Sequence, residues 1–210
     1  MIKLLTEKGN NAVPRVLETI LINTSLIQDV LNAFNSDNPK LRYGSSKTIL
    51  LLSEQKPELL YPFFPFFIKL LSSENIIIKC TAIDIICNLS YVDIDNKIDE
   101  NIIKKLIDFI TCDSQITASH VVENIWKLTL NGNLTPEELT KAFLRVSEAH
   151  ITSECKNVLA GHIIESFSKF FDLISNDAKK EVLAFAKFHT TNTRIGTRKK
   201  AEQFIKQFIR

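Results

Sequence analysis

Two His-x-x-Glu pairs are the residues of this sequence whose types and spacing come nearest to a chemical site. His120 and Glu123 form one pair, and His162 and Glu165 form the other. An imidazole beside a carboxylate can bind a metal ion or transfer a proton. Residues three apart are also ordinary neighbours on a helix surface, so the favoured interpretation is a histidine that is solvated or satisfied in the core. We therefore predict neither a catalytic residue nor a metal ligand.

The C-terminal segment carries a concentration of positive charge that could bind a polyanion. Residues 179–210 hold nine Lys or Arg and two Glu, a formal charge of +7, against −5 for residues 1–178. The candidate polyanion-binding residues are Arg194, Arg198, Lys199 and Lys200. The favoured alternative is a solvated last helix whose cations interact favourably with its C-terminal end. The same interaction accounts for His150 and His189, which are assigned to helix ends.

Other chemistries find no support in the residue spacing. The five Gly are isolated, so there is no glycine-rich phosphate-binding loop, and no Ser, Cys or His lies in a recognisable nucleophile motif. Four cysteines without C-x-x-C spacing are expected to be small core residues, and these are Cys80, Cys87, Cys112 and Cys155. We predict no cofactor. Because no signal-peptide core or membrane span is recognisable, we expect a cytoplasmic protein without a membrane partner.

Composition and periodicity indicate how such residues would be positioned. The 210 residues include 45% apolar and 24% charged types but only 5 Gly and 6 Pro, too few turn residues for a β-sandwich or barrel. Amphipathic segments alternate with short polar breaks, which predicts an all-α protein. The predicted helices are about 12–22, 25–35, 39–54, 57–72, 76–91, 99–111, 115–131, 136–149, 153–173, 177–189 and 193–209.

These helices repeat in pairs. The second helix of each pair is predicted to open near a small polar residue, at intervals of 37, 39, 39 and 39 residues; these residues are Asn38, Asn75, Ser114, Ser153 and Asn192. A period of this length made of two helices is typical of an α-solenoid, in which each unit buries its apolar face by stacking on its neighbours.

Residues 38–52, NPKLRYGSSKTILLL, resemble the second helix of a HEAT repeat. In that family a polar turn precedes an aliphatic residue and a cation, then a small residue and aliphatics at helical spacing. Ile78-Lys79 and Cys155-Lys156 repeat the aliphatic–cation pair, whereas residues 114–131 have Ile116-Thr117 where a cation is usual. Residues 192–202 resemble a terminal capping repeat with a polar outer face.

The resemblance covers residues 38–210, and the whole chain is similar to small prokaryotic HEAT-repeat proteins that lack an assigned activity. It implies an all-α, right-handed α-α superhelix of antiparallel helix pairs. The expected organisation is an N-terminal helical cap over residues 1–37 and a single continuous solenoid domain over residues 38–210.

Two aromatic features have a structural and a functional interpretation. Pro62 and Pro65 should interrupt a helix over 57–72, and the four Phe of residues 63–67 are expected mainly in the core, with a self-association patch as the alternative. Core packing is also expected for Trp126, the only Trp.

A non-enzymatic scaffold that binds another protein or a peptide is the favoured function. Helical phase places the partner-binding residues on the second helices, at Tyr43, Lys47, Asp84, Asn88, His120, Glu123, His162 and Glu165. The alternative is a nucleic-acid-binding or DNA-repair protein related to the HEAT-like alkylpurine DNA glycosylases, which use aromatic and acidic residues on a basic concave face. Self-association is a third possibility.

Overall fold

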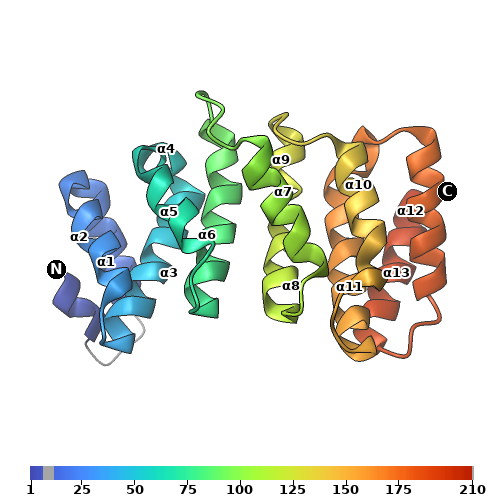
Figure 1. The fold of residues 1–210 in the computed structure, drawn as a ribbon, viewed down its shortest axis with the longest axis horizontal. Helices are drawn as coiled ribbons and strands as arrows, with labels where there is room; N and C mark the ends of the chain where they lie inside the picture. Colours follow the sequence, from blue (N-terminus) through green and yellow to red (C-terminus); the bar gives the residue numbers. More distant parts are fainter. Residues whose placement is uncertain (7–11, 210) are drawn as a thin grey trace. The chain divides into compact units, whose positions relative to one another are not determined.

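A computed structural model describes residues 1–6 and 12–209 (Figure 1). In this part of the chain all regular secondary structure is helical, which confirms the all-α prediction. The chain forms two compact units, residues 1–94 and residues 95–210. The expected cap over 1–37 and continuous repeat domain over 38–210 remain predictions.

In the first unit, the second helices α3 (Pro39–Gln55) and α6 (Ile76–Leu89) pack side by side. Helix α3 also packs on α1 (Ala12–Ile22), and α6 packs on α5 (Phe64–Leu70). The shorter elements of this unit are η1 (Ile2–Thr6), η2 (Thr24–Leu26), α2 (Ile27–Asn32), η3 (Ala33–Asn35), α4 (Pro57–Leu60), η4 (Tyr61–Phe63) and η5 (Ser90–Val92). Each helix thus buries its apolar side against the next, as expected for stacked helix pairs.

The proline-rich segment breaks as predicted. Helix α4 ends at Leu60, a 3-10 turn carries Pro62, and α5 begins at Phe64. Phe64 and Phe67 are 3% and 0% exposed, and Phe63 and Phe66 are half-buried. Since all four rings are at least half-buried, core packing accounts for this segment and leaves no exposed aromatic patch on it.

In the second unit, α11 (Ser153–Phe170) packs between α8 (Gln115–Asn124) and α13 (Ile195–Phe208). Helix α12 (Asn176–His189) packs on α13 and on α10 (Pro136–Leu144). Figure 1 shows the turn between α10 and α11 and the turn between α12 and α13 at the same end of the unit. The remaining elements are α7 (Glu100–Asp108), η6 (Phe109–Thr111), α9 (Lys127–Leu130), η7 (Arg145–Glu148) and η8 (Phe171–Leu173).

Aromatic rings join the helices of this unit at its core. The ring centroid of Phe167 on α11 lies 5.4 Å from the ring centroid of Phe143 on α10 and 6.2 Å from that of Phe185 on α12. Phe143 and Phe167 are 0% and 1% exposed. Burying such a ring contributes about 2 kcal/mol, so these contacts help fix the positions of three helices relative to one another.

The predicted helix over 115–131 is interrupted. Helix α8 ends at Asn124, and the amide of Thr129 donates to the carbonyl oxygen of Trp126 at 3.0 Å, an i→i+3 bond in place of the α-helical ladder. The Trp126 indole N–H donates to the carbonyl oxygen of Glu123 at 2.8 Å. Trp126 is half-buried at this break and therefore is not the fully packed core residue that was expected.

The last repeat begins later than predicted. The N-cap of α13 is Arg194, not Asn192. The side-chain oxygen of Asn192 accepts a hydrogen bond from the backbone amide of Arg194 at 2.9 Å. In the same way, the hydroxyl of Ser36 accepts a hydrogen bond from the backbone amide of Asn38 at 3.2 Å. Asn192 is therefore the equivalent of Ser36, two residues before the N-cap of the helix. An Asn is an ordinary N-cap residue, which explains the mistaken register.

Candidate partner-binding surface

Two side-chain contacts join neighbouring second helices of the second unit. Nδ1 of His162 on α11 lies 2.5 Å from Oε1 of Glu123 on α8. Nζ of Lys200 on α13 lies 2.5 Å from Oε2 of Glu165 on α11. We call the surface formed by Glu123, His162, Glu165, Lys200 and Gln203 the second-helix surface. The side chains of the two acids are 42% and 58% exposed, so they are accessible to a partner.

The histidines do not take equivalent places. His120 lies six residues after the N-cap Ser114, and His162 lies ten residues after the N-cap Thr152. The two predicted His-x-x-Glu pairs therefore do not superimpose, and His162 pairs with Glu123 of the preceding second helix. Searching residues 1–6 and 12–209 finds no group of three or more His, Cys, Asp or Glu that could hold a metal ion.

The electrostatics of the Glu123–His162 pair follow from its position. The hydrogen bond from His162 lowers the pKa of the Glu123 carboxyl, and partial burial opposes this. Nearby positive charge, including Lys200, adds a smaller lowering. Glu123 is therefore held as a carboxylate at neutral pH, and it presents a fixed negative charge between α8 and α11.

In the first unit, Tyr43 and Lys47 lie on α3 where the sequence places them. Lys47 is exposed, and Tyr43 is half-buried with the Arg42 guanidinium 4.9 Å from its ring centroid. The Tyr43 hydroxyl accepts a hydrogen bond from Nδ2 of Asn75 at 3.3 Å, and this bond, followed by the one from Arg42, lowers the tyrosine pKa. Both side chains line a shallow groove of about 440 Å³ that also includes Leu5.

Asp84 and Asn88 on α6 differ from the expected exposed placement. Asp84 is 8% exposed and Asn88 is 4% exposed. Nδ2 of Asn88 donates to Oγ of Ser53 at 2.9 Å, which ties α6 to α3. Helical phase put these residues on the correct helix but on a buried side of it, so they act in packing rather than on an open surface.

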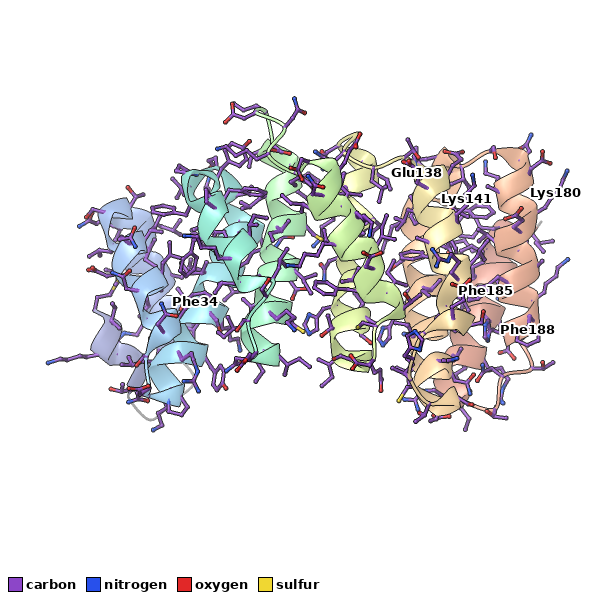
Figure 2. The ribbon with its side chains drawn as sticks, viewed as in Figure 1. Phe34, Glu138, Lys141, Lys180, Phe185 and Phe188 are labelled. Atoms are coloured by element: carbon purple, nitrogen blue, oxygen red, sulfur yellow. The ribbon has the colours of Figure 1, made fainter. Side chains whose placement is uncertain are left out.

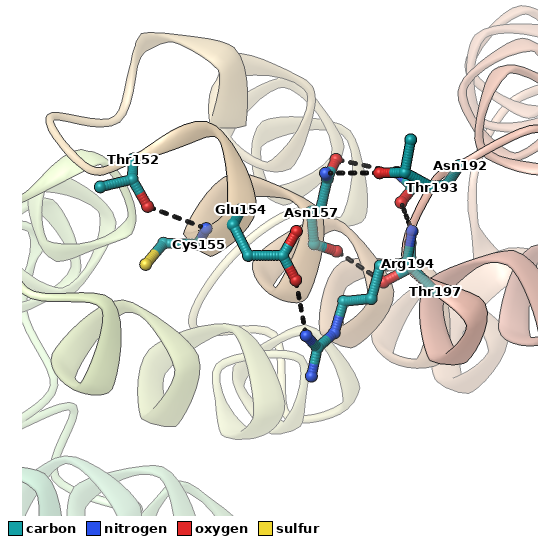
Figure 3. A network of polar contacts seen from close by, with 8 residues as sticks. All are labelled: Thr152, Glu154, Cys155, Asn157, Asn192, Thr193, Arg194 and Thr197. Carbon is teal, nitrogen blue, oxygen red and sulfur yellow. Dashed lines mark hydrogen bonds and ion pairs between the residues drawn. The ribbon is translucent and has the colours of Figure 1, made fainter.

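Most of the candidate basic residues at the start of α13 contact other groups of the protein, and Figure 3 shows this for Arg194 and Glu154. Arg194 pairs with Glu154 at 2.7 Å, and Arg198 donates to the carbonyl oxygen of Asn192 at 3.0 Å. Lys200 forms an ion pair with Glu165, whereas Lys199 is exposed. Three of the four candidate polyanion-binding residues therefore have intramolecular partners.

The aliphatic–cation pair of the repeats has a structural role that the spacing alone did not reveal. Arg42 and Arg198 each lie four residues after a helix N-cap. Arg42 donates to the carbonyl oxygen of Ser36 at 2.8 Å, and Arg198 makes the same contact with Asn192. The cation thus closes the turn before the second helix. In the last repeat Thr197 takes the place of the aliphatic residue before Arg198, and the mistaken register had concealed this match.

Asn157 on α11 is the residue at this junction that sequence reasoning missed. Its Oδ1 accepts from Nδ2 of Asn192 at 2.9 Å, and its backbone oxygen accepts from the hydroxyl of Thr197 at 2.6 Å (Figure 3). Its Nδ2 lies 3.5 Å from the hydroxyl of Thr193. These hydrogen bonds join the start of α13 to α11. They therefore help fix the two helices that carry part of the second-helix surface.

Comparison with known proteins supports the fold but does not indicate a function. No protein-family model matches the chain, and no curated protein sequence matches it. The chain is similar in structure to a designed armadillo repeat protein, YIII(Dq)4CqI, with a TM-score of 0.55 and 12% identity over 98% of this chain and 97% of that one.

Two engineered proteins solved by the Northeast Structural Genomics Consortium are similar as well. Target OR366 has a TM-score of 0.53 and 15% identity over 98% of this chain and 95% of that chain. Target OR497 has a TM-score of 0.52 and 11% identity over 98% of this chain and 51% of that chain. At these identities the likeness shows the fold alone, which is an all-α helical-repeat solenoid.

Proposed function

We propose that this helical-repeat solenoid is a non-enzymatic scaffold that binds an extended segment of another protein on its second-helix surface. The observation that carries the proposal is the arrangement of Glu123, His162, Glu165 and Lys200 across three successive second helices, α8, α11 and α13. Acidic and basic groups held in fixed places can bind a polar chain without losing side-chain freedom on binding.

The spacing of the helices suits such a partner. Packed helices lie about 8–10 Å apart, and an extended chain advances about 3.3 Å per residue. About every third residue of a bound segment would therefore meet the next second helix. The exposed oxygens of Glu123 and Glu165 would pair with basic side chains or backbone amides of that segment.

We further propose that the repeats are of the HEAT type and that the protein is cytoplasmic. The contacts of Arg42 and Arg198 support the first point, because they give the aliphatic–cation pair a repeated structural role. Within the described residues none of the four cysteines forms a disulfide, which fits a reducing compartment. No helix in the described residues is long and apolar enough to span a bilayer.

Selection from a displayed peptide library, followed by affinity measurement, tests the proposed function. We expect the selected peptides to bind the double variant Glu123→Gln/Glu165→Gln about tenfold more weakly than the parent protein. The control is Glu100→Gln/Glu181→Gln, which makes the same charge change at exposed positions of α7 and α12. Equal affinities of both variants for every selected peptide would contradict the proposed surface.

A further inference from the structure

A cavity of about 400 Å³ lies in the second unit, and it shares no residue with the second-helix surface. It is bordered by η7, by the first half of α11 and by the last turns of α12. Leu144, Phe185 and Phe188 supply most of its apolar wall. Figure 2 shows both Phe rings on the lower half of α12. A volume of this size is in the range of pockets that hold small organic ligands.

Phe188 is the feature of this cavity that folding alone does not explain. It is 75% exposed, whereas Phe185 one turn earlier is half-buried and packs against Phe167. An exposed apolar ring that lines a cavity is placed to contact a ligand that occupies the cavity. The edge of His189 lies between these rings, with centroids 4.6 Å from Phe185 and 5.1 Å from Phe188.

His189 presents a hydrogen-bond donor to the cavity. The amide of Arg194 donates to Oδ1 of Asn192, so Nδ2 of Asn192 is the atom that faces Nδ1 of His189 at 2.9 Å. Nδ1 must then be the acceptor, and the ring proton is on Nε2. Burial lowers the pKa of His189, which keeps the ring neutral. His189 is 7% exposed and lines the cavity, and in the described chain its ring forms a hydrogen bond through Nδ1 and none through Nε2.

Lys156 makes the cavity positive. Its Nζ donates one hydrogen bond to the carbonyl oxygen of Ser147 at 2.6 Å, which leaves further donors of the ammonium group available. The cavity lining includes no Asp or Glu. A group bound among Lys156, His189 and the Phe rings would therefore need an apolar body and an anionic acceptor.

We propose that this cavity binds an apolar carboxylate, either a small aliphatic or aromatic acid or the C-terminal residue of a peptide. The apolar part packs between Phe188 and Leu144. The carboxylate accepts hydrogen bonds from the Lys156 ammonium and from Nε2–H of His189. This site is separate from the proposed scaffold function, and either can fail without the other.

Titration of the full chain with hexanoate, followed by amide and side-chain NMR shifts, tests the site. We expect saturable shifts at Phe185, Phe188 and His189, with hexanol and acetate each binding about tenfold more weakly because each lacks one half of the ligand. No saturable shift at these residues, or equal binding of hexanol, would overturn the proposal.

Matched variants localise the binding. Phe188→Ala and Lys156→Met alter exposed or half-exposed side chains, so the fold is retained, and each should weaken hexanoate binding about fivefold to tenfold. Lys104→Met, a charge loss on exposed α7, serves as the control and should leave binding unchanged. Unaltered binding by both cavity variants would also overturn the proposal.

Peptides distinguish the two sources of the carboxylate. A short peptide that ends in Leu is compared with the same peptide amidated at its C-terminus. Binding of the free-acid form with loss on amidation identifies a chain terminus as a ligand. If hexanoate binds and the free-acid peptide does not, the ligand is a small acid. If neither compound binds, the proposal is overturned.

Discussion

His162 on α11 and Glu123 on α8 form a hydrogen-bonded pair between successive second helices, with 2.5 Å between Nδ1 and Oε1. The equivalent step from α11 to α13 is made by Glu165 and Lys200, also at 2.5 Å. Each pair joins two helices through side chains that remain partly exposed. The contacts that stabilise the stack therefore also arrange charge on the surface proposed to bind a partner.

The first prediction concerns pH. The pKa of Glu123 is lowered from 4.5 in the folded protein, chiefly by the hydrogen bond from His162, so its contribution to stability is present above the unfolded value and lost as pH falls through the folded one. Because Glu123 is 42% exposed, we expect Glu123→Gln to cost about 0.5 kcal/mol at pH 7. Urea unfolding at pH 7 and pH 3 measures the difference. A cost that stays the same at both pH values would contradict this assignment.

The second prediction concerns the contact between α11 and α13 at Gly161. A Cβ added there would lie 2.8 Å from Oγ1 and 3.4 Å from Cα of Thr197. That hydroxyl is held by its bond to the Asn157 carbonyl oxygen, so it cannot move freely. We expect Gly161→Ala to destabilise the protein by about 1–2 kcal/mol, even though Ala favours helix formation.

Gly196→Ala is the matched control, because a Cβ at Gly196 meets nothing within 4 Å. It should leave stability unchanged or raise it slightly. Chemical unfolding of both variants gives the comparison. If Gly161→Ala were as stable as Gly196→Ala, the close approach of the two helices would be wrong.

The third prediction separates the structural from the exposed cations of α13. Arg198 is half-buried and donates to the carbonyl oxygen of Asn192, whereas Lys199 is exposed. We expect Arg198→Met to cost about 1–2 kcal/mol, and Lys199→Met to change stability by less than about 0.5 kcal/mol. Thermal unfolding followed by circular dichroism measures both. Equal melting temperatures would show that the turn does not depend on the arginine.

The fourth prediction concerns nucleic acid. Glu154 and Glu165 offset the charges of Arg194 and Lys200, which leaves less positive charge at those residues to neutralise phosphates. Arg198 keeps its charge, but it is half-buried and bound to the Asn192 carbonyl oxygen. We expect duplex and single-stranded DNA to bind no more tightly than about 10⁻⁶ M at moderate salt. Fluorescence anisotropy at low and moderate salt measures this. Tighter, salt-sensitive binding that is lost when Arg194, Arg198, Lys199 and Lys200 are changed to Ala would favour the nucleic-acid alternative.

Much of the fold could be predicted because its signals are local. The all-α class and the break at Pro62 and Pro65 follow from residue type and helical periodicity. The register of the last repeat could not be predicted, because Asn192 caps a turn as readily as it caps a helix.

The site was harder to predict, because it depends on how helices are rotated. A shift of one residue turns a helix face by about 100°, so Asn88 is buried while His162 reaches another helix. His189 shows the same limit. Its place at the end of α12 suggested a cation that interacts with the helix dipole, but burial lowers its pKa and keeps it neutral. The spacing of residues in the sequence does not predict which side chains of neighbouring helices will contact a given residue.

Site-specific crosslinking tests the scaffold proposal most directly. A photoreactive phenylalanine analogue would replace Gln203 on the second-helix surface and, in a separate protein, Lys141 on α10; both positions are exposed. We predict that a discrete protein is crosslinked from position 203 in cells, that position 141 does not capture it, and that Glu123→Gln/Glu165→Gln reduces the yield. Capture of the same protein from position 141 alone, or of none from position 203, would contradict a partner-binding role for the second-helix surface.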